Sequence, residues 1–215
     1  MFPAKLMGGL ALATALLAAP HASAEKLRTH FDTDSAGRAP GFFDLVVWGA
    51  PGNADWIVLG DVNPPSTPNK LIQTIGNRPA GSMAIALRRK YEFRDGEVSV
   101  GLRRGGGQSG IALRASGEKD FLLVLVDGTS GEARATSWVG GKATDLARGK
   151  AVIDHEWGTL KIKASGPSIE AFWNGKPLLT ATDPHPMAGR VGLATAGPGQ
   201  ASFDELVFDV AASAP

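Results

Sequence analysis

Clusters of glycine and proline interrupt this sequence so often that no stretch long enough for a stable helix keeps a helical period. The chain contains 28 glycine and 14 proline residues, many of them in turn-forming groups such as RDGE, RRGGGQSG, VDGTSGE, WNGK and TAGPGQ. Glycine accepts positive φ and proline fixes φ, so both mark turns. A globular helix usually runs for about 8 to 20 residues. We therefore expect the short segments between these groups to be strands.

Alternation of apolar and polar side chains supports this expectation. In residues 159–164, Leu160, Ile162 and Ala164 share one face, as the period of a half-buried strand requires. Residues 121–127, FLLVLVD, are apolar on both faces, which predicts a central strand that is covered on each side. Short strands at regular spacing between turns predict an all-β fold, an antiparallel two-sheet jelly-roll sandwich forming a single domain.

The first residues have the pattern of a secretory signal peptide. Lys5 supplies the positive end, residues 6–19 the apolar stretch and residues 22–24 a small-residue cleavage pattern. The apolar stretch is too short for a comfortable membrane span. We expect a signal peptide over 1–24, a β-sandwich domain over 25–215, and a secreted or periplasmic mature protein.

Charge and cysteine content exclude several classes of function. The chain has 22 basic and 21 acidic side chains, so removing Lys5 with the leader leaves 21 of each. A balanced surface argues against nucleic acid or an anionic membrane as the main partner, because both attract concentrated positive charge. The absence of cysteine excludes disulfides, thiolate metal sites and cysteine nucleophiles.

Residues 168–183, SIEAFWNGKPLLTATD, predict a tight hairpin. Asn174-Gly175 supplies the two positive-φ residues of a type I′ turn. Trp173 shares one strand face with Ile169 and Ala171, which favours a packing role because a large aromatic ring buries much area. The alternative is that Trp173 is a platform for a sugar.

The second half of the chain resembles a known family. The segments EWGTLKIKASGPSIEAFWNGKPLLTATD, GRVGLAT and ASFDELVF occur in order. They resemble the concanavalin A-like (laminin-G-like) jelly rolls and, more closely, are similar to the 3-keto-disaccharide hydrolase domain family and its secreted relatives. The resemblance covers residues 27–210, and DWIVLGD, NKLIQT and GGGQSGIALRA extend it to the first half. It implies a fold more specifically than a function, because this architecture carries many functions.

No paired-carboxylate hydrolase site is visible. Retaining glycosidases on this architecture bring carboxylates together across the scissile bond, whereas Glu97 stands alone at the start of a strand. His155 lies next to Glu156, and adjacent strand residues point to opposite faces. The family resemblance implies elimination or hydrolysis of a 3-keto-glycoside, for which Glu97 or His155 would be the candidate base and Arg114 the oxyanion stabiliser.

Polar residues on predicted strands form a candidate ligand-binding face. Alternation predicts that Arg114 projects from the sheet next to Arg103, with Gln108 in the loop between their strands and Trp138 on a later strand that also displays Arg134. Arginine, amide and indole groups suit sugar hydroxyls and an apolar sugar face. The family resemblance, which implies that the Ser-Gly-Ile-Xaa-Xaa-Arg strand lies beside the concave face, makes Arg114 the first choice. The alternative is a solvated outer face without a ligand.

A structural calcium ion is a further possibility. Asp32 and Asp34 lie near the first strand and Asp204 near the last, and Ca²⁺ prefers such hard oxygen ligands. The three residues would meet if the terminal strands pair. The alternative, which we favour, is that they cap turns and that no cofactor is bound.

These observations favour an exported domain that binds a glycan or another polyol without catalysis. The first alternative is a hydrolase or lyase acting on 3-keto-glycosides, and the second is a structural or adhesion domain of the cell envelope. The sequence leaves the sugar and the oligomeric state open.

Overall fold

The computed structural model describes residues 25–210. The expected signal peptide, with its cleavage point after Ala24, lies outside the described residues. Fifteen strands and one 3₁₀ turn, η1 (Phe31–Thr33), make up the described chain. Between residues 25 and 210, no helix is long and apolar enough to cross a membrane.

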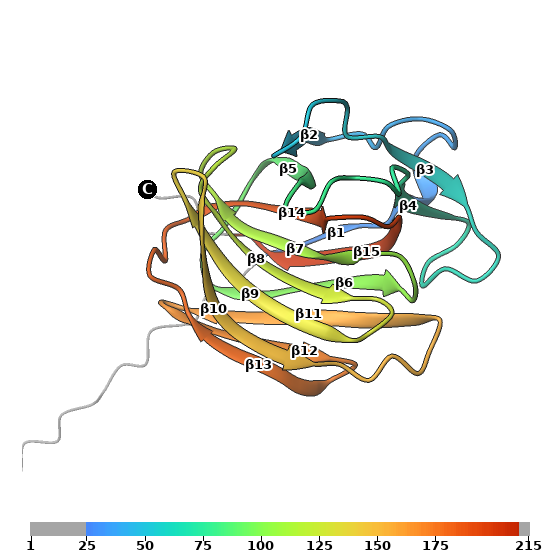
Figure 1. Ribbon diagram of the computed structural model, residues 1–215. Coiled ribbons are helices and arrows are strands. Elements are labelled where there is room, and N and C mark those ends of the chain that lie inside the picture. Colours follow the sequence, from blue (N-terminus) through green and yellow to red (C-terminus); the bar gives the residue numbers. More distant parts are fainter. Residues whose placement is uncertain (1–24, 211–215) are drawn as a thin grey trace, which may run out of the picture.

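The strands form two antiparallel sheets packed face to face (Figure 1). An eight-stranded sheet has the order β13-β12-β11-β6-β15-β4-β3, with β1 also paired to β15, and a seven-stranded sheet has the order β10-β9-β8-β7-β14-β5-β2. The strands of the eight-stranded sheet are β1 (Lys26–Thr29), β3 (Trp56–Gly60), β4 (Asn69–Gln73), β6 (Gly96–Arg103), β11 (Trp157–Ser165), β12 (Ser168–Trp173), β13 (Lys176–Thr182) and β15 (Ala201–Asp209). The strands of the seven-stranded sheet are β2 (Phe43–Trp48), β5 (Met83–Phe93), β7 (Gln108–Ala115), β8 (Phe121–Asp127), β9 (Glu132–Val139), β10 (Lys142–Lys150) and β14 (Gly189–Ala196). This arrangement confirms the predicted two-sheet, antiparallel all-β sandwich.

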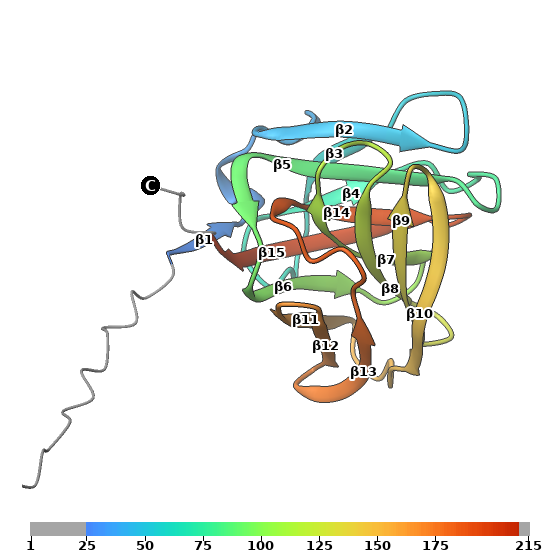
Figure 2. The same cartoon turned by 90° about the vertical axis from the view of Figure 1, so that its left-hand side faces the viewer.

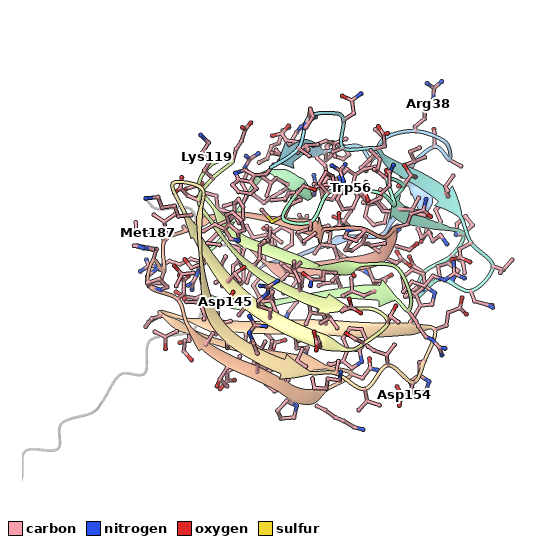
Figure 3. All side chains as sticks on the ribbon, in the orientation of Figure 1. Arg38, Trp56, Lys119, Asp145, Asp154 and Met187 are labelled. Atoms are coloured by element: carbon pink, nitrogen blue, oxygen red, sulfur yellow. The ribbon has the colours of Figure 1, made fainter. Side chains whose placement is uncertain are left out.

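The core lies between the sheets and follows the predicted alternation. Leu160, Ile162 and Ala164 of β11 are all buried and belong to one core cluster with buried side chains of the other sheet, such as Ile111 and Val124. In Figure 3 the labelled Trp56 side chain lies within this interior. The period of two in the sequence therefore identified the core face of the strands correctly.

The seven-stranded sheet has a second apolar cluster on its outer face, away from the core. Phe121, Leu123 and Leu125 of β8 belong to this cluster together with Met83 and Ile85 of β5. The sheet twists so strongly that β2 and β5 run across β9 and β10 (Figure 2). The strand predicted to be covered on both faces, β8, is buried. Its outer side chains, however, form the floor of a surface cleft and do not contact another layer.

The predicted adjacency of the strands that carry Arg103 and Arg114 is wrong. β6 belongs to the eight-stranded sheet and β7 to the seven-stranded sheet, so the loop at 104–107 crosses from one layer to the other. Alternation determines which face of a strand is buried, but it says nothing about which strands become neighbours.

The β12–β13 hairpin has the predicted turn. Asn174 and Gly175 have φ values of 48° and 77°, the positive values that a type I′ turn requires. The Trp173 ring belongs to the main core and is 8% exposed, and its Nε1 donates a hydrogen bond to the Val152 carbonyl oxygen at 2.9 Å. The packing interpretation of Trp173 is therefore confirmed. Gly158 on β11 leaves the space that this ring fills, because a Cβ at position 158 would overlap with the indole.

Substitution of Gly158 by alanine should test this contact. We expect Gly158→Ala to destabilise the fold by about 1–3 kcal/mol, as overpacking of a core does, and to lower the melting temperature by roughly 2–10 °C. Gly117→Ala is the matched control, since its Cβ would have no neighbour closer than 4.0 Å. If both variants had the same melting temperature, the packing of the Trp173 ring would not require a glycine at position 158.

Candidate functional site

The outer face of the seven-stranded sheet carries a cleft of about 510 Å³. Its floor is formed by the apolar side chains of the second cluster, chiefly Met83, Leu123 and Leu125. The loops at 80–81 and 197–198 form part of its rim. Its polar lining comes from Gln108, Asp127, Arg134, Thr136 and Asp145. The cleft thus combines an apolar floor with a small set of hydrogen-bonding groups, as small-molecule sites do.

Strand pairing explains why these side chains share one face. Gln108 lies directly across from Asp127, and Thr136 lies between Leu123 and Asp145 in the ladder. Residues directly opposite each other in an antiparallel ladder project to the same side of the sheet. The polar residues of β7, β8, β9 and β10 therefore converge on the apolar floor.

Trp138 lines the cleft, and neighbouring aromatic rings hold its indole in place. The centroid of the Trp138 ring lies 4.5 Å from that of Trp48 in an edge-to-face arrangement and 5.7 Å from that of Phe121 in a stacked arrangement. Trp138 Nε1 donates to Thr136 Oγ1 at 3.2 Å. These contacts hold the half-buried indole in one orientation, which reduces the conformational entropy that a ligand would have to remove.

Charged side chains also line the cleft. Asp145 Oδ1 lies 3.5 Å from Arg134 Nη1, and its Oδ2 accepts a hydrogen bond from Arg148 Nη2 at 2.6 Å. Figure 3 shows Asp145 on the β9–β10 strand pair. The hydrogen bond from Arg148 and the charge of Arg134 lower the pKa of Asp145. This carboxylate is therefore ionised at neutral pH and is a weak base.

Asp127 is also held in its ionised form. Burial acts to raise its pKa, but the backbone N–H groups of Ser130 and Thr129, at 2.7 and 3.0 Å, together with the Ser130 side chain and the charge of Lys150, lower it below its usual value. The carboxylate closes the turn after β8 through these bonds. Both acidic groups of the cleft thus accept hydrogen bonds readily and take up protons poorly.

The structure brings together two of the four residues predicted to bind ligand. Gln108 and Trp138 both line the cleft, and Arg134, predicted to share a face with Trp138, lines it as well. The sequence analysis missed Asp127 and Asp145. Asp145 lies on β10, a strand signalled by the Gly140-Gly141 turn, whose two residues have positive φ.

Arg114 does not project from the sheet, so its predicted placement is wrong. Its side chain is 2% exposed, and its Nη1 lies 2.7 Å from Oδ2 of Asp183, which is 3% exposed. Its other N–H groups donate to the carbonyl oxygens of Arg94 and Gly166 and to Asp95. Arg114 therefore ties three turns together at one end of the sandwich.

A β-bulge causes this reorientation. The pairing of β7 with β14 shifts register where Ala112 and Ala115 face Gly192 and Arg190, and Arg114 has a φ of 53°. An extra residue in one strand breaks the alternation and turns the side chain aside. The positive φ is unfavourable for arginine, so the buried hydrogen bonds have to stabilise it.

Arg103 also lies outside the cleft. Its Nη1 is 3.3 Å from Asp61 Oδ2, and its Nη2 bonds to Glu156, on the outer face of the eight-stranded sheet. Asp61 also binds Lys70 at 2.7 Å. Arg103 is thus part of an ion-pair network on the other side of the molecule, because its strand belongs to the other sheet.

Glu97 and His155 do not meet. Glu97 lies opposite Lys163, while His155 precedes Trp157 at the other end of β11. Hydrogen bonds from Lys163 and Lys161 lower the pKa of Glu97, and the His155 side chain is 71% exposed. Neither residue lines the cleft, so they do not form an acid–base pair there.

The three aspartates considered for calcium do not gather. Among residues 25–210, no group of three or more His, Cys, Asp or Glu side chains could hold a metal ion. Asp32 accepts from the backbone N–H of Asn69, and the Asn69 side chain donates to the carbonyl oxygen of Asp34. Asp204 accepts from Ser66, and burial raises its pKa. Asp32, Asp34 and Asp204 therefore do not share a cation site.

Comparison with known families gives one match. A family model described as a 3-keto-alpha-glucoside-1,2-lyase-like domain matches residues 54–208. This region includes the residues that line the cleft and every strand of the two sheets except β1 and β2. No curated protein sequence matches the chain.

Several solved structures have the same fold. They include the carbohydrate binding module CBM66 from Bacillus subtilis, with a TM-score of 0.54 and 19% identity over 70% of this chain and 92% of that one. The VIP36 exoplasmic/lumenal domain in its Ca²⁺/Man-bound form has a TM-score of 0.53 and 13% identity over 88% and 91%. A Bacillus subtilis protein of unknown function with a galectin-like fold has a TM-score of 0.51 and 13% identity over 73% and 90%. The chain is thus a concanavalin A-like jelly roll.

The buried Arg114–Asp183 pair leads to a stability prediction. We expect Arg114→Ala to cost about 3–5 kcal/mol, because it leaves Asp183 charged and unpaired in the interior. Arg148→Ala removes an exposed salt bridge and should change stability by roughly 0.5 kcal/mol or less. Urea unfolding of both variants measures the difference. An unaltered unfolding midpoint in Arg114→Ala would contradict the structural role.

Proposed function

The chain belongs to the family of 3-keto-alpha-glucoside-1,2-lyase-like domains, and we propose that it is an exported protein that binds a glycan or related polyol in the cleft without converting it. The observation that carries this proposal is the Trp138 ring held beside Gln108 and Arg134 over an apolar floor. An indole covers the apolar face of a sugar ring, while amide and guanidinium groups bind its hydroxyls.

The descriptions of two solved structures with this fold also support a role in sugar binding. One of them is called a carbohydrate binding module, and another is a Ca²⁺/Man-bound form. At their low sequence identity these likenesses concern the fold alone. The inference that this chain binds sugar therefore depends on the side chains of its own cleft.

The acidic groups of the cleft favour binding over catalysis. A general base works best when its pKa lies near the working pH. The pKa of Asp145 is lowered by Arg148 and Arg134, and that of Asp127 is lowered, against the effect of its burial, by hydrogen bonds from Ser130 and Thr129 and by the charge of Lys150. Within the described chain, the cleft lining supplies these two carboxylates and no histidine. Both carboxylates are better suited to accept hydrogen bonds from hydroxyl groups.

A second candidate function is a lyase or hydrolase reaction on 3-keto-glycosides, and the family match favours it. A C–H bond beside a carbonyl group is acidic, so elimination requires a base and a donor that stabilises the oxyanion. In this cleft Asp145 or Asp127 would be the base and Arg134 the stabilising donor. Glu97 and His155 lie elsewhere and do not take these roles.

Arg134→Ala should weaken sugar binding by about 1.5–3 kcal/mol, the range for a hydrogen bond to a charged group. Arg148→Ala is the matched control, because Arg148 is the other partner of Asp145 and is not part of the cleft lining. Calorimetry with glucans, simple disaccharides and 3-keto-disaccharides measures the affinities. Similar affinities for both variants would exclude the cleft as the sugar site.

Product analysis on the same 3-keto-disaccharides separates the two candidate functions. Unchanged sugar after long incubation supports binding alone. Turnover that is lost in Asp145→Asn or Asp127→Asn would establish the lyase or hydrolase function instead. Absence of any response to the whole panel would favour a structural or adhesion domain.

Export has its own test. We expect the mature protein to begin at Glu25, because signal peptidases cut after small residues such as Ala24. Mass spectrometry of the protein recovered from the cell envelope or medium gives the terminal peptide. Recovery of intact peptides that contain Lys5 would contradict processing and export.

A further inference from the structure

The cleft does not continue across the outer face of the seven-stranded sheet. Next to it on that face lie the central side chains of the second apolar cluster, which are covered: Ile85 and Leu87 of β5 are 1% exposed, and Ala112 of β7 and Ala194 of β14 are fully buried. None of them lines the cleft. A sugar chain that enters the cleft therefore meets packed side chains there and not an extended groove.

The twist of the sheet produces this cover. β9 and β2 are separated in the sheet by β8, β7, β14 and β5, yet the ring of Trp48 at the end of β2 lies against that of Trp138 on β9, with centroids 4.5 Å apart. β2 and β5 run across β9 and β10 (Figure 2), which brings the two indoles together. A Cβ at Gly141 in the β9–β10 turn would lie 3.7 Å from the Trp48 ring, so this ring lies against the turn as well. The outer face is therefore closed on itself where Trp48 meets Trp138.

Loops close the cleft along another part of its rim. Gly197 N donates to the Ser82 carbonyl oxygen at 2.9 Å, which joins the β14–β15 loop to the segment before β5. A Cβ at Gly107 would overlap with the Pro198 carbonyl oxygen, so the segment before β7 lies directly against the same loop. Gly107, Gly197 and Pro198 all line the cleft. The three segments are thus joined into one rim, and a sugar chain has no passage between them.

The side of the cleft that β9 and β10 form is open. The side chains of Arg134 and Asp145, two of the hydrogen-bonding groups of the cleft, are 40% and 45% exposed. Arg148, which lies across from Arg134 in the ladder, is 70% exposed. The polar groups of the cleft can therefore be reached from this side, and a ligand that binds them can extend into solvent here.

We propose that the cleft holds the terminal unit of a saccharide chain, or a short free saccharide, and does not hold an internal stretch of a polysaccharide. The inference rests on the proposed function, because it specifies which sugars the same cleft accepts. An internal stretch has to leave its site in two directions, whereas the Trp48–Trp138 contact and the joined loops leave one side open. A terminal unit has to leave in one direction only. An enclosed cleft also buries a larger share of a small ligand, and this burial contributes much of the affinity.

The first test measures how binding depends on chain length. Malto- and laminari-oligosaccharides, from the disaccharide to long oligomers of known length, are titrated calorimetrically against the full chain, together with the 3-keto-disaccharides. We expect no more than one protein molecule per chain end at every length, and an affinity that stops rising once the terminal units fill the cleft. Arg134→Ala should weaken binding by the same factor at every length, about tenfold or more, because one site holds all of these ligands.

The outcomes separate this inference from the proposed function. Binding of the short saccharides alone would support the inference. If the number of bound protein molecules rose with chain length beyond the number of chain ends, internal stretches would be accepted. That result would overturn the inference and leave sugar binding in the cleft intact. No binding of any sugar would overturn both.

The second test measures the closed face directly and needs no sugar. The chain contains no cysteine, so a single introduced thiol reports how accessible its position is to a maleimide. Ala143→Cys places the thiol in the cleft lining, and Ile85→Cys places it in the covered centre of the face. We expect Ile85→Cys to react at least about tenfold more slowly, since its thiol is reached only when the sheet opens locally. Leu87→Cys replaces Ile85→Cys if thermal melting shows that the latter does not fold. Equal rates at the cleft and at the centre would show an open groove and overturn the inference.

Discussion

The buried ion pair between Arg114 and Asp183 links the two layers of the sandwich and constrains the turns around it. Arg114 belongs to the seven-stranded sheet, and Asp183 follows the last hairpin of the eight-stranded sheet. The same guanidinium also bonds to the turns at Arg94 and Gly166. A charged group in the interior is tolerated only when its partners satisfy it, so the geometry of these turns is closely determined. The pair thereby fixes the end of β7, a strand that lies in the middle of the sheet bearing the cleft.

The sequence predicted local structure better than it predicted neighbours. The alternation around Leu160 and the Asn174-Gly175 turn were predicted correctly, because strand period and positive φ are local properties. The adjacency of Arg103 and Arg114 was predicted wrongly, since strand pairing depends on contacts far apart in the chain. A bulge adds a second error, as one extra residue reverses the alternation and turned a predicted surface arginine inward.

The residues of the cleft could be predicted only in part, because residue type and strand position are local properties and strand pairing is not. Gln108 and Trp138 were identified because their residue types suit sugars and their strands were recognised. Asp145 was missed because residues 142–150 alternate poorly, with a register shift between Asp145 and Ala147. The apolar outer face of β8 was visible in the sequence, but it was interpreted as contact with another layer. An apolar strand face that no layer covers is a useful sign of a binding surface.

The contact between β10 and β13 has a consequence for how this protein behaves at high concentration. Gly149 lacks a side chain, and the Leu178 carbonyl oxygen occupies the space where a Cβ would lie. The last strands of the two sheets therefore cover each other on that side of the sandwich. Exposed edge strands are templates on which other chains add strands and aggregate. β1, β2 and β3 each pair with one other strand and are not covered in this way, so self-association by strand addition would begin at these strands.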